Sequence, residues 1–370
     1  MSSDDPTARF FDTRAAYLLF ATATTEKASV AERLGDELAM LTPRPPGLRV
    51  FDAGMGDASV LTQLMRRIHT VFPRIPLTVV GKEISVEDVR QALARLPDRL
   101  FEHPEMVFVV TNMRFAEAAR LAPDDLTEMT WREVALDGDT THEFASQIRD
   151  LLDDLTGDWE VETSPTTGNP VYVHPAVAVI YRADHEFLLR SMIPQPDGPA
   201  FSYDLVVAAQ AYRAAAPLER KVRSVVAPLA RALAPGGRLV GVHSTGDDPG
   251  MEIIRGVWPE ENPFTHGRHE LLAEARRQLG EDAFRFPELS DDEATIRYEM
   301  HTMPSESAEH IGTSSVLATW NAAAYVAQID ETRLSEAMRT GAWEKATRAV
   351  MERHPRVWFE DEAYLILRAI

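Results

Sequence analysis

The sequence predicts an α/β protein built on a doubly wound, mostly parallel, Rossmann-like sheet. The first observation is an apolar run, Leu48–Asp52, followed by a glycine turn and an amphipathic segment, Val60–Ile68. The second is that this alternation of strand and helix patterns continues along the chain, which favours parallel strands joined by helices. Further strand-like runs lie at 77–83, 106–111, 203–209 and 238–243, and a last one at 362–368.

The composition is that of a globular protein with a large core. The chain has 370 residues, of which 45% are hydrophobic and 26% charged. With 38 Lys and Arg against 58 Asp and Glu, the formal net charge is −20, which disfavours nucleic acid and anionic membranes as partners. Cysteine is absent, which excludes disulfides and thiolate chemistry. No segment has the length and apolarity of a signal peptide or membrane helix, so we expect a cytoplasmic protein.

Composition and pattern changes divide the chain into a core with additions. We expect a small-molecule site in the core. The segment 118–200 is too long to be a bare loop, so we expect it to be folded. A helix over Glu143–Leu155 and a hairpin over Trp159–Val173 are predicted within it. We expect this segment to fold over the carboxyl edge of the sheet, as a lid, a homodimer interface or a substrate region. The predicted units are an N-terminal helical cap (1–47), the core (48–117, 201–304 and 356–370), the α+β insertion (118–200) and a helical insertion (305–355).

A glycine turn and an acidic strand end predict a nucleotide-like cofactor. Gly54 and Gly56 follow the first strand, where missing side chains let a ligand approach the backbone. Glu83 ends the second strand, where a carboxylate can accept hydrogen bonds from ribose hydroxyls. Asp57 disfavours a pyrophosphate and suits a cationic sulfonium. A tight turn without a ligand and a solvated Glu83 are the alternatives.

These motifs together resemble the class I S-adenosylmethionine-dependent methyltransferases. The resemblance lies in Asp52-Ala-Gly-Met-Gly-Asp57, Glu83, Tyr203–Ala208 and the Pro-Gly-Gly turn within Leu233–Val240, and it spans roughly 48–117 and 201–370. It implies a seven-stranded sheet whose last strand is antiparallel, with S-adenosylmethionine as cofactor. The cofactor-binding residues that it implies are Asp52, Gly54, Gly56, Glu83, Asn112, Met113 and Ala209, with the adenine near Asn112 and Met113.

A fainter resemblance to histamine N-methyltransferase concerns the methyl acceptor. It lies in Phe20–Glu26, Ala209–Tyr212 and Phe359–Asp361, and it implies that Glu26, Gln210 and Asp361 contact an amine. Two departures separate this chain from that enzyme. It has a carboxylate at 361 in place of an amide, and the segment 118–200 has no counterpart there.

The chemistry of these positions is coherent by itself. Methyl transfer from a sulfonium needs an aligned lone pair and the exclusion of water. Gln210 would orient the acceptor and Tyr212 would shape the wall, while Glu26 and Asp361 would hold an ammonium group or accept its proton. His243 ends the fifth strand at the same edge, where it would orient the substrate or act as a base. Solvated surface roles for the carboxylates and a structural role for His243 are the alternatives.

The predicted function is therefore S-adenosylmethionine-dependent methylation of a small molecule, with an amine or imidazole-like nitrogen as the favoured acceptor in an in-line (SN2) transfer. Methylation of an oxygen or carboxylate of a natural-product scaffold is one alternative. A non-catalytic binding protein with the same fold is another. The missing third glycine counts against a nicotinamide-dependent dehydrogenase. The histidines lack a metal-binding spacing, so no metal is expected.

Overall fold

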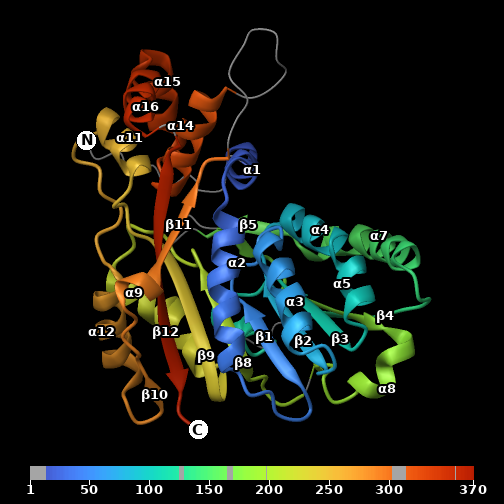
Figure 1. Ribbon diagram of the computed structural model, residues 1–370. Coiled ribbons are helices and arrows are strands. Elements are labelled where there is room, and N and C mark those ends of the chain that lie inside the picture. Colours follow the sequence, from blue (N-terminus) through green and yellow to red (C-terminus); the bar gives the residue numbers. More distant parts are fainter. Residues whose placement is uncertain (1–13, 125–128, 165–169, 197, 302–313, 355) are drawn as a thin grey trace.

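The computed structural model describes residues 14–124, 129–164, 170–196, 198–301, 314–354 and 356–370. Three predicted segments fall partly outside these ranges: the start of the N-terminal cap, most of the hairpin turn near 165–169 and the start of the helical insertion. Within the described ranges, one large sheet runs through the molecule with helices on both faces (Figure 1).

Seven strands of this sheet form the predicted core. In spatial order they are β3, β2, β1, β8, β9, β12 and β11. The neighbours from β3 to β9 are parallel, whereas β12 is antiparallel to both β9 and β11. The predicted doubly wound sheet with an antiparallel last strand is thus confirmed. The bounds are β1 (Leu48–Asp52), β2 (Leu77–Lys82), β3 (Met106–Thr111), β8 (Tyr203–Ala209), β9 (Leu233–Ser244), β11 (Thr295–Glu299) and β12 (Trp358–Arg368).

Helices bury an apolar layer on each face of the sheet. On α3, Leu61, Leu64, Met65 and Ile68 follow helical spacing, and all are buried. One face carries α2 (Glu26–Asp36), α3 (Ser59–Val71), α4 (Val86–Ala94), α5 (Leu96–Glu102) and α7 (Thr141–Asp158). The other carries α6 (Phe115–Ala118), α9 (Leu218–Lys221), the π-helical turn η3 (Val222–Val226), α10 (Ala227–Arg231) and α12 (Arg268–Leu279).

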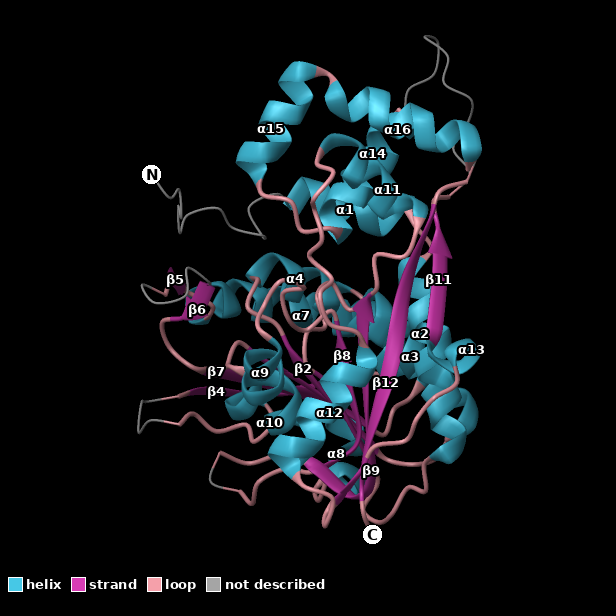
Figure 2. Cartoon of the chain, turned by 90° about the vertical axis from the view of Figure 1, so that its left-hand side faces the viewer, coloured by secondary structure: helices cyan, strands magenta, loops and turns pink. Residues whose placement is uncertain are grey.

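A third, separate core forms a cap above the carboxyl ends of the parallel strands (Figure 2). It packs aromatic rings from distant parts of the chain, such as Phe20, Tyr298 and Phe359, with the last two stacked at 5.4 Å between ring centroids. Within the predicted helical insertion, Gly341, with a φ of +71°, ends one helix and starts the next. The cap comprises α1 (Arg14–Ala23), α11 (Pro249–Val257), α14 (Ser315–Val326), α15 (Glu331–Thr340) and α16 (Ala342–Arg353).

The segment 118–200 extends the sheet sideways, which corrects the expectation that it covers the carboxyl edge. Its strand β7 (Ala176–Arg182) pairs antiparallel with β3, and β4 (Thr130–Leu136) pairs parallel with β7. Along the chain, β4 is followed by α7, by the hairpin of β5 (Val161–Thr163) and β6 (Pro170–Tyr172), and then by β7. The Trp159 indole reaches the carboxyl edge, where it donates to the Glu83 carbonyl oxygen at 2.9 Å.

The apolar run at 187–193 is only partly buried. Leu189 and Met192 are buried, but Phe187 and Leu188, on the short helix α8 (Glu186–Leu189), are 80% and 50% exposed. The smaller elements are η1 (Glu37–Met40), η2 (Ala183–His185), β10 (Phe284–Arg285), which pairs with β12, and α13 (Asp291–Ala294). No helix in the described part of the chain has the length and apolarity to cross a membrane.

We predict that Gly241→Ala destabilises the fold. Gly241 lies on β9 beneath Tyr364 of β12, and an added Cβ would overlap the tyrosine ring. We expect a loss of about 1–3 kcal/mol in the free energy of unfolding, measured by urea denaturation. Gly157→Ala in α7 is the control, because a Cβ there meets no atom within 4 Å, and it should be neutral or stabilising. Equal stabilities of the two variants would contradict the packing of β12 on β9.

Candidate active site

The glycine turn between β1 and α3 leaves backbone open to a ligand. Gly54 is exposed, and a Cβ built on it meets no atom within 4 Å. Gly56 has a φ of +53°, and Ala58 adopts a similar left-handed conformation just before α3 begins. The turn therefore presents an unobstructed stretch of main chain at the carboxyl end of the central strand.

Glu83 organises this turn from the end of β2. Its Oε2 accepts the Gly56 N–H at 3.0 Å, and its Oε1 accepts the N–H groups of Ile84 and Ser85, both at 2.8 Å. Burial raises the pKa of this carboxyl, although Lys82 and the backbone donors oppose the change. A carboxylate has about four acceptor positions, so Oε2 retains room for one more donor, as a ribose hydroxyl would require.

Asp52 supports the same turn from the end of β1. It is 4% exposed, and its Oδ1 accepts the Gly54 N–H at 3.1 Å. Burial raises the pKa of Asp52 to about 6, and the nearby Glu83 carboxylate adds to the rise. Asp52 thus fixes the conformation of the turn.

The Asp57 carboxylate has hydrogen-bond partners that the sequence did not predict. It accepts from the backbone and hydroxyl of Ser59, from the Tyr17 hydroxyl at 3.1 Å and from Arg95 at 2.9 Å. Burial raises its pKa, but these donors outweigh burial, so the pKa is lowered overall. Because Arg95 neutralises this carboxylate, Asp57 no longer argues for a cationic ligand. Its contact with Tyr17 ties the cap helix α1 to the glycine turn.

The side chains of Asn112 and Met113, which are predicted to lie near the adenine, are engaged within the fold. The Asn112 amide nitrogen donates to the carbonyls of Asp158 and His174, and its oxygen accepts the Ala176 N–H. Met113 is wholly buried in the core. Asn112 therefore anchors the insertion to β3, a role that the sequence could not show without knowing that β7 pairs with β3.

A second cluster forms around Asp361, which is 0% exposed on β12. Its Oδ1 accepts from the Ser244 hydroxyl at 2.7 Å, and its Oδ2 accepts from the Gln210 amide at 3.1 Å. Gln210 directly follows Ala209, at the end of β8, and has a φ of +50°. Since Gln210 is exposed, its side chain joins the open carboxyl edge of the sheet to a fully buried acid.

Glu26, at the start of α2, acts electrostatically on Asp361. It is 4% exposed and its Oε2 lies 3.0 Å from the Lys27 ammonium. The Glu26 carboxylate raises the pKa of Lys27 although burial lowers it. Burial first, and then the Glu26 charge, raise the pKa of Asp361 to about 7, against the opposing hydrogen bonds from Ser244 and Gln210. The structure thus brings Glu26, Gln210 and Asp361 into one cluster.

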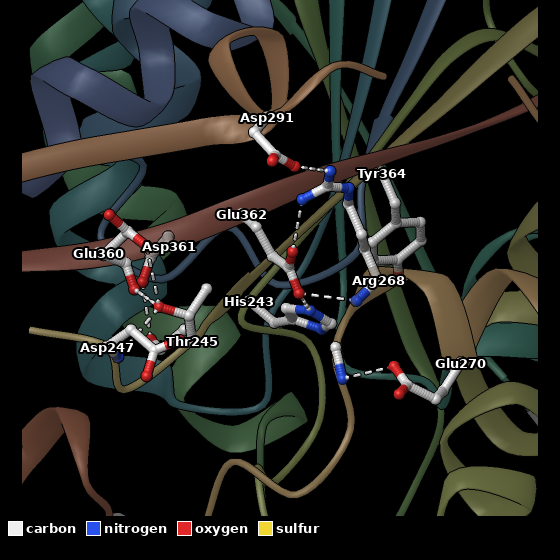
Figure 3. Close-up of polar contacts among 12 residues, drawn as sticks. His243, Thr245, Asp247, Arg268, Glu270, Asp291, Glu360, Asp361, Glu362 and Tyr364 are labelled. Atoms are coloured by element: carbon white, nitrogen blue, oxygen red, sulfur yellow. Dashed lines mark hydrogen bonds and ion pairs between the residues drawn. The ribbon is translucent and has the colours of Figure 1, made fainter. Parts of the chain in front are cut away.

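Tyr212 and His243 belong to a third group. From His243 this group continues through Glu362, as Figure 3 shows. His243 Nε2 lies 2.8 Å from Glu362 Oε1, and its Nδ1 lies 2.7 Å from the Tyr212 oxygen. Glu362 also accepts from the backbone and guanidinium of Arg268. These partners outweigh burial and lower the pKa of Glu362, so it accepts the Nε2 proton of His243.

With His243 neutral, its Nδ1 can accept the Tyr212 hydroxyl proton, for which the Tyr364 oxygen at 3.3 Å is the other acceptor. The sequence reading missed Glu362 and Arg268. The signal for Glu362 was available, because neighbours on a strand point to opposite faces, which sends Asp361 and Glu362 to different clusters. Arg268 gave no such signal, since it starts a surface helix. The described residues contain no group of three His, Asp or Glu side chains placed to hold a metal ion.

Known proteins resemble this chain only distantly. No family model and no curated protein sequence matches it. Among solved structures it is similar to YjhP from E. coli (12% identity, TM-score 0.37, covering 99% of this chain and 96% of that one). It is also similar to the plantazolicin methyltransferase BpumL in complex with SAH (9%, 0.38, 99% and 94%). A third is a putative sarcosine dimethylglycine methyltransferase from Galdieria sulphuraria (11%, 0.36, 92% and 84%).

The seven core strands of this chain include one antiparallel strand, β12, as the resemblance to the class I methyltransferases implies. The glycine turn and Glu83 fit an adenosine cofactor, because Gly54 has open space in front of it and Glu83 keeps an unused acceptor position.

We predict that Gly54→Val weakens cofactor binding without affecting the fold. The new side chain would occupy the open space in front of the turn, where no protein atom lies within 4 Å of the Cβ position. We expect the affinity for S-adenosylhomocysteine, measured by calorimetry, to fall by about tenfold or more. The thermal unfolding midpoint of the unliganded variant should match that of the wild type. An unchanged affinity for S-adenosylhomocysteine would show that the glycine turn is not part of the cofactor site.

Proposed function

We propose that this protein transfers a methyl group from S-adenosylmethionine to the nitrogen of a small amine. The observation that carries the proposal is Asp361, a wholly buried carboxyl whose hydrogen-bond partners, Gln210 and Ser244, are both neutral. It lies at the carboxyl edge of the sheet, where ligands of open α/β sheets bind. A buried carboxylate needs a cation or a proton to offset its desolvation.

The residues that would hold the cofactor are at the ends of β1, β2 and β8. The main chain of Gly54 and Gly56 would lie against it, Glu83 Oε2 would accept from a ribose hydroxyl, and Ala209 would border it beside Gln210. When bound, S-adenosylmethionine supplies an electrophilic methyl group on a positively charged sulfur. Asp52 holds the glycine turn in shape through the Gly54 N–H.

The charges around Asp361 favour a cationic ligand. Glu26 is neutralised by Lys27, whereas Asp361 has no basic partner among its hydrogen bonds. When Asp361 is ionised, the side chains of Glu26, Lys27 and Asp361 therefore carry one net negative charge together. A protonated amine would balance it, and Gln210 Oε1, which makes no hydrogen bond within the described structure, could accept a second N–H of the ligand.

Asp361 is also placed to handle the proton. A nitrogen can accept a methyl group only after it loses a proton and exposes its lone pair. Asp361, with a pKa of about 7, can accept that proton on a carboxylate oxygen near neutral pH. The new N–CH3 bond then forms as the methyl group leaves sulfur, and the cap core over the carboxyl edge excludes water.

Methylation of a hydroxyl group is the second candidate, and Tyr212 with His243 favours it. A hydroxyl acceptor needs a base, and His243 Nδ1 is held as a proton acceptor by the Glu362 contact on its other nitrogen. The two candidates differ in which of Asp361 and His243 is indispensable.

We predict that Gln210→Ala lowers kcat/KM for the amine by about 10–100-fold, because the amide orients the acceptor. The affinity for S-adenosylhomocysteine should change by less than about twofold, since Gln210 is proposed to contact the acceptor. Steady-state kinetics and calorimetry give the two values. Arg213→Ala, an exposed change three residues further along, serves as the control. Parallel losses in both quantities would show a general disturbance of the β8 end.

We predict that amine binding strengthens with pH through Asp361. Its carboxylate fraction grows as the pH rises through about 7. The affinity of the S-adenosylhomocysteine complex for phenethylamine, which stays protonated, should therefore rise by about tenfold between pH 6 and pH 8. Asp361→Asn should bind weakly at both values. Calorimetry at the two pH values tests this. An equal rise in affinity in Asp361→Asn would show that Asp361 is not the group whose ionisation controls binding.

The same pKa shift affects stability with a definite sign. The pKa of Asp361 in the folded state lies above the ordinary value of 3.8, so the folded state holds its proton more tightly. The stabilisation that this provides is present below pH 4 and is lost as the pH rises through 7. Relative to Asp361→Asn, the wild type should therefore lose on the order of 1–3 kcal/mol of unfolding free energy between pH 5 and pH 8.

A further inference from the structure

A small cavity lies next to the Asp361 cluster, on the other side of Gln210 and Ser244. It has a volume of about 10 Å³ and is enclosed by the ends of β8 and β9, by α9 and by the loop before α12. Its walls carry positive or hydrogen-bonding groups, and none of its lining residues is acidic. They are Gln210, Tyr212, Ala214, Lys221, His243, Ser244, Phe264 and His266.

Lys221 is the notable member of this wall. It is 4% exposed at the end of α9, and within the described structure it makes no ion pair and no hydrogen bond through its ammonium group. Its Nζ lies 5.4 Å from the centre of the Tyr212 ring. Burial lowers the pKa of this lysine. The Lys221 ammonium has no anionic partner among the described residues, and an anion in the cavity would offset the desolvation of this lysine.

His266 supplies a second donor facing the cavity. Its Nδ1 lies 2.8 Å from the Thr265 hydroxyl, which can donate to it and so leave the proton on Nε2. Two carboxylates lie behind the cavity wall. Glu362 is already paired with His243 and Arg268, which offsets its repulsion of an anion in the cavity. Asp361 is hydrogen-bonded to the lining residues Gln210 and Ser244.

Two residues join this cavity to the proposed amine site. Gln210 and Ser244 line the cavity, and the same two side chains donate to Asp361. A ligand lying across Gln210 and Ser244 would meet a carboxylate at one end and the Lys221 ammonium at the other. This arrangement matches the charges of a molecule with an amine and an acid group.

We propose that the Lys221 cavity binds a carboxylate of the methyl acceptor, so that the acceptor is a zwitterion of the amino-acid class. The inference rests on the proposed function and names its substrate class. A cavity of this volume holds about one water molecule, so a carboxylate enters it only if the loop 259–267 moves outward. That loop has no regular secondary structure, and its Thr265 is exposed.

Acetate tests the cavity without any knowledge of the acceptor. NMR spectra of the full chain during an acetate titration should show saturable shifts of the His266 ring signals, with chloride at equal ionic strength as control. Lys221→Met should abolish saturation, and Lys221→Arg should retain it. Absence of a saturable shift in the wild type, or saturation that survives in Lys221→Met, would overturn the subsite.

Matched acceptor pairs test the substrate class. The pairs are phenylalanine and phenethylamine, histidine and histamine, and glycine and methylamine, compared by kcat/KM. In the wild type the amino acid of at least one pair should be preferred by about tenfold or more, the effect of one charged hydrogen bond. Lys221→Met should bring that ratio close to one, whereas Lys221→Arg should keep it. An amine as good as its amino acid in every pair would refute the zwitterion.

The failures of the two proposals are distinguishable. Methylation of the amines that depends on Asp361 but gains nothing from a carboxylate would uphold the amine site and refute the Lys221 subsite. S-adenosylhomocysteine binding should be equal in Lys221→Met and the wild type, and a loss there would assign Lys221 to cofactor binding. Acetate binding without methylation of any pair would uphold the anion site and refute the amino-acid acceptor.

Discussion

The burial of the Asp361 carboxyl is the constraint around which the carboxyl edge is built. Removing a charge from water is expensive, and neutral hydrogen bonds compensate only part of that cost. Gln210 adopts a left-handed backbone conformation at the end of β8, from which its amide reaches Asp361. The antiparallel register of β12 places Asp361 directly opposite Ser244 on β9. Three strands thus converge on one acid.

The long strand β12 joins all three cores of the molecule. Tyr364 and Ile366 pack on one face of the sheet, Ala363 and Leu365 on the other, and Phe359 in the cap. Its alternation also separates two chemistries, because Asp361 faces Gln210 while Glu362 faces His243. This strand near the C-terminus therefore determines both the pKa of the Asp361 carboxyl and the tautomer of His243.

The sequence predicted those features that depend on local patterns. The strand and helix periodicities and the glycine turn are local, and they indicated the core sheet and its ligand-facing edge. The roles of Asn112 and Asp57 depended on partners far away in the chain, namely Ala176 and Arg95, and no local pattern reports such partners. The same applies to Lys221, whose buried position depends on the packing of α9. Strand β7 was missed because its apolar run matches a buried helix segment as well as a strand.

The sideways insertion has a consequence for the outer boundary of the sheet. Without it, β3 would be the terminal strand, and all six of its residues are buried. An unpaired apolar strand of that kind offers its free backbone groups to other chains. β7 covers it, and the new boundary is β4, which carries Arg132 and Glu133 and is flanked by ion pairs from Arg132 to Asp154 and Asp158. The insertion thus makes the edge of this sheet charged, and a core stripped of it would be prone to aggregate through β3.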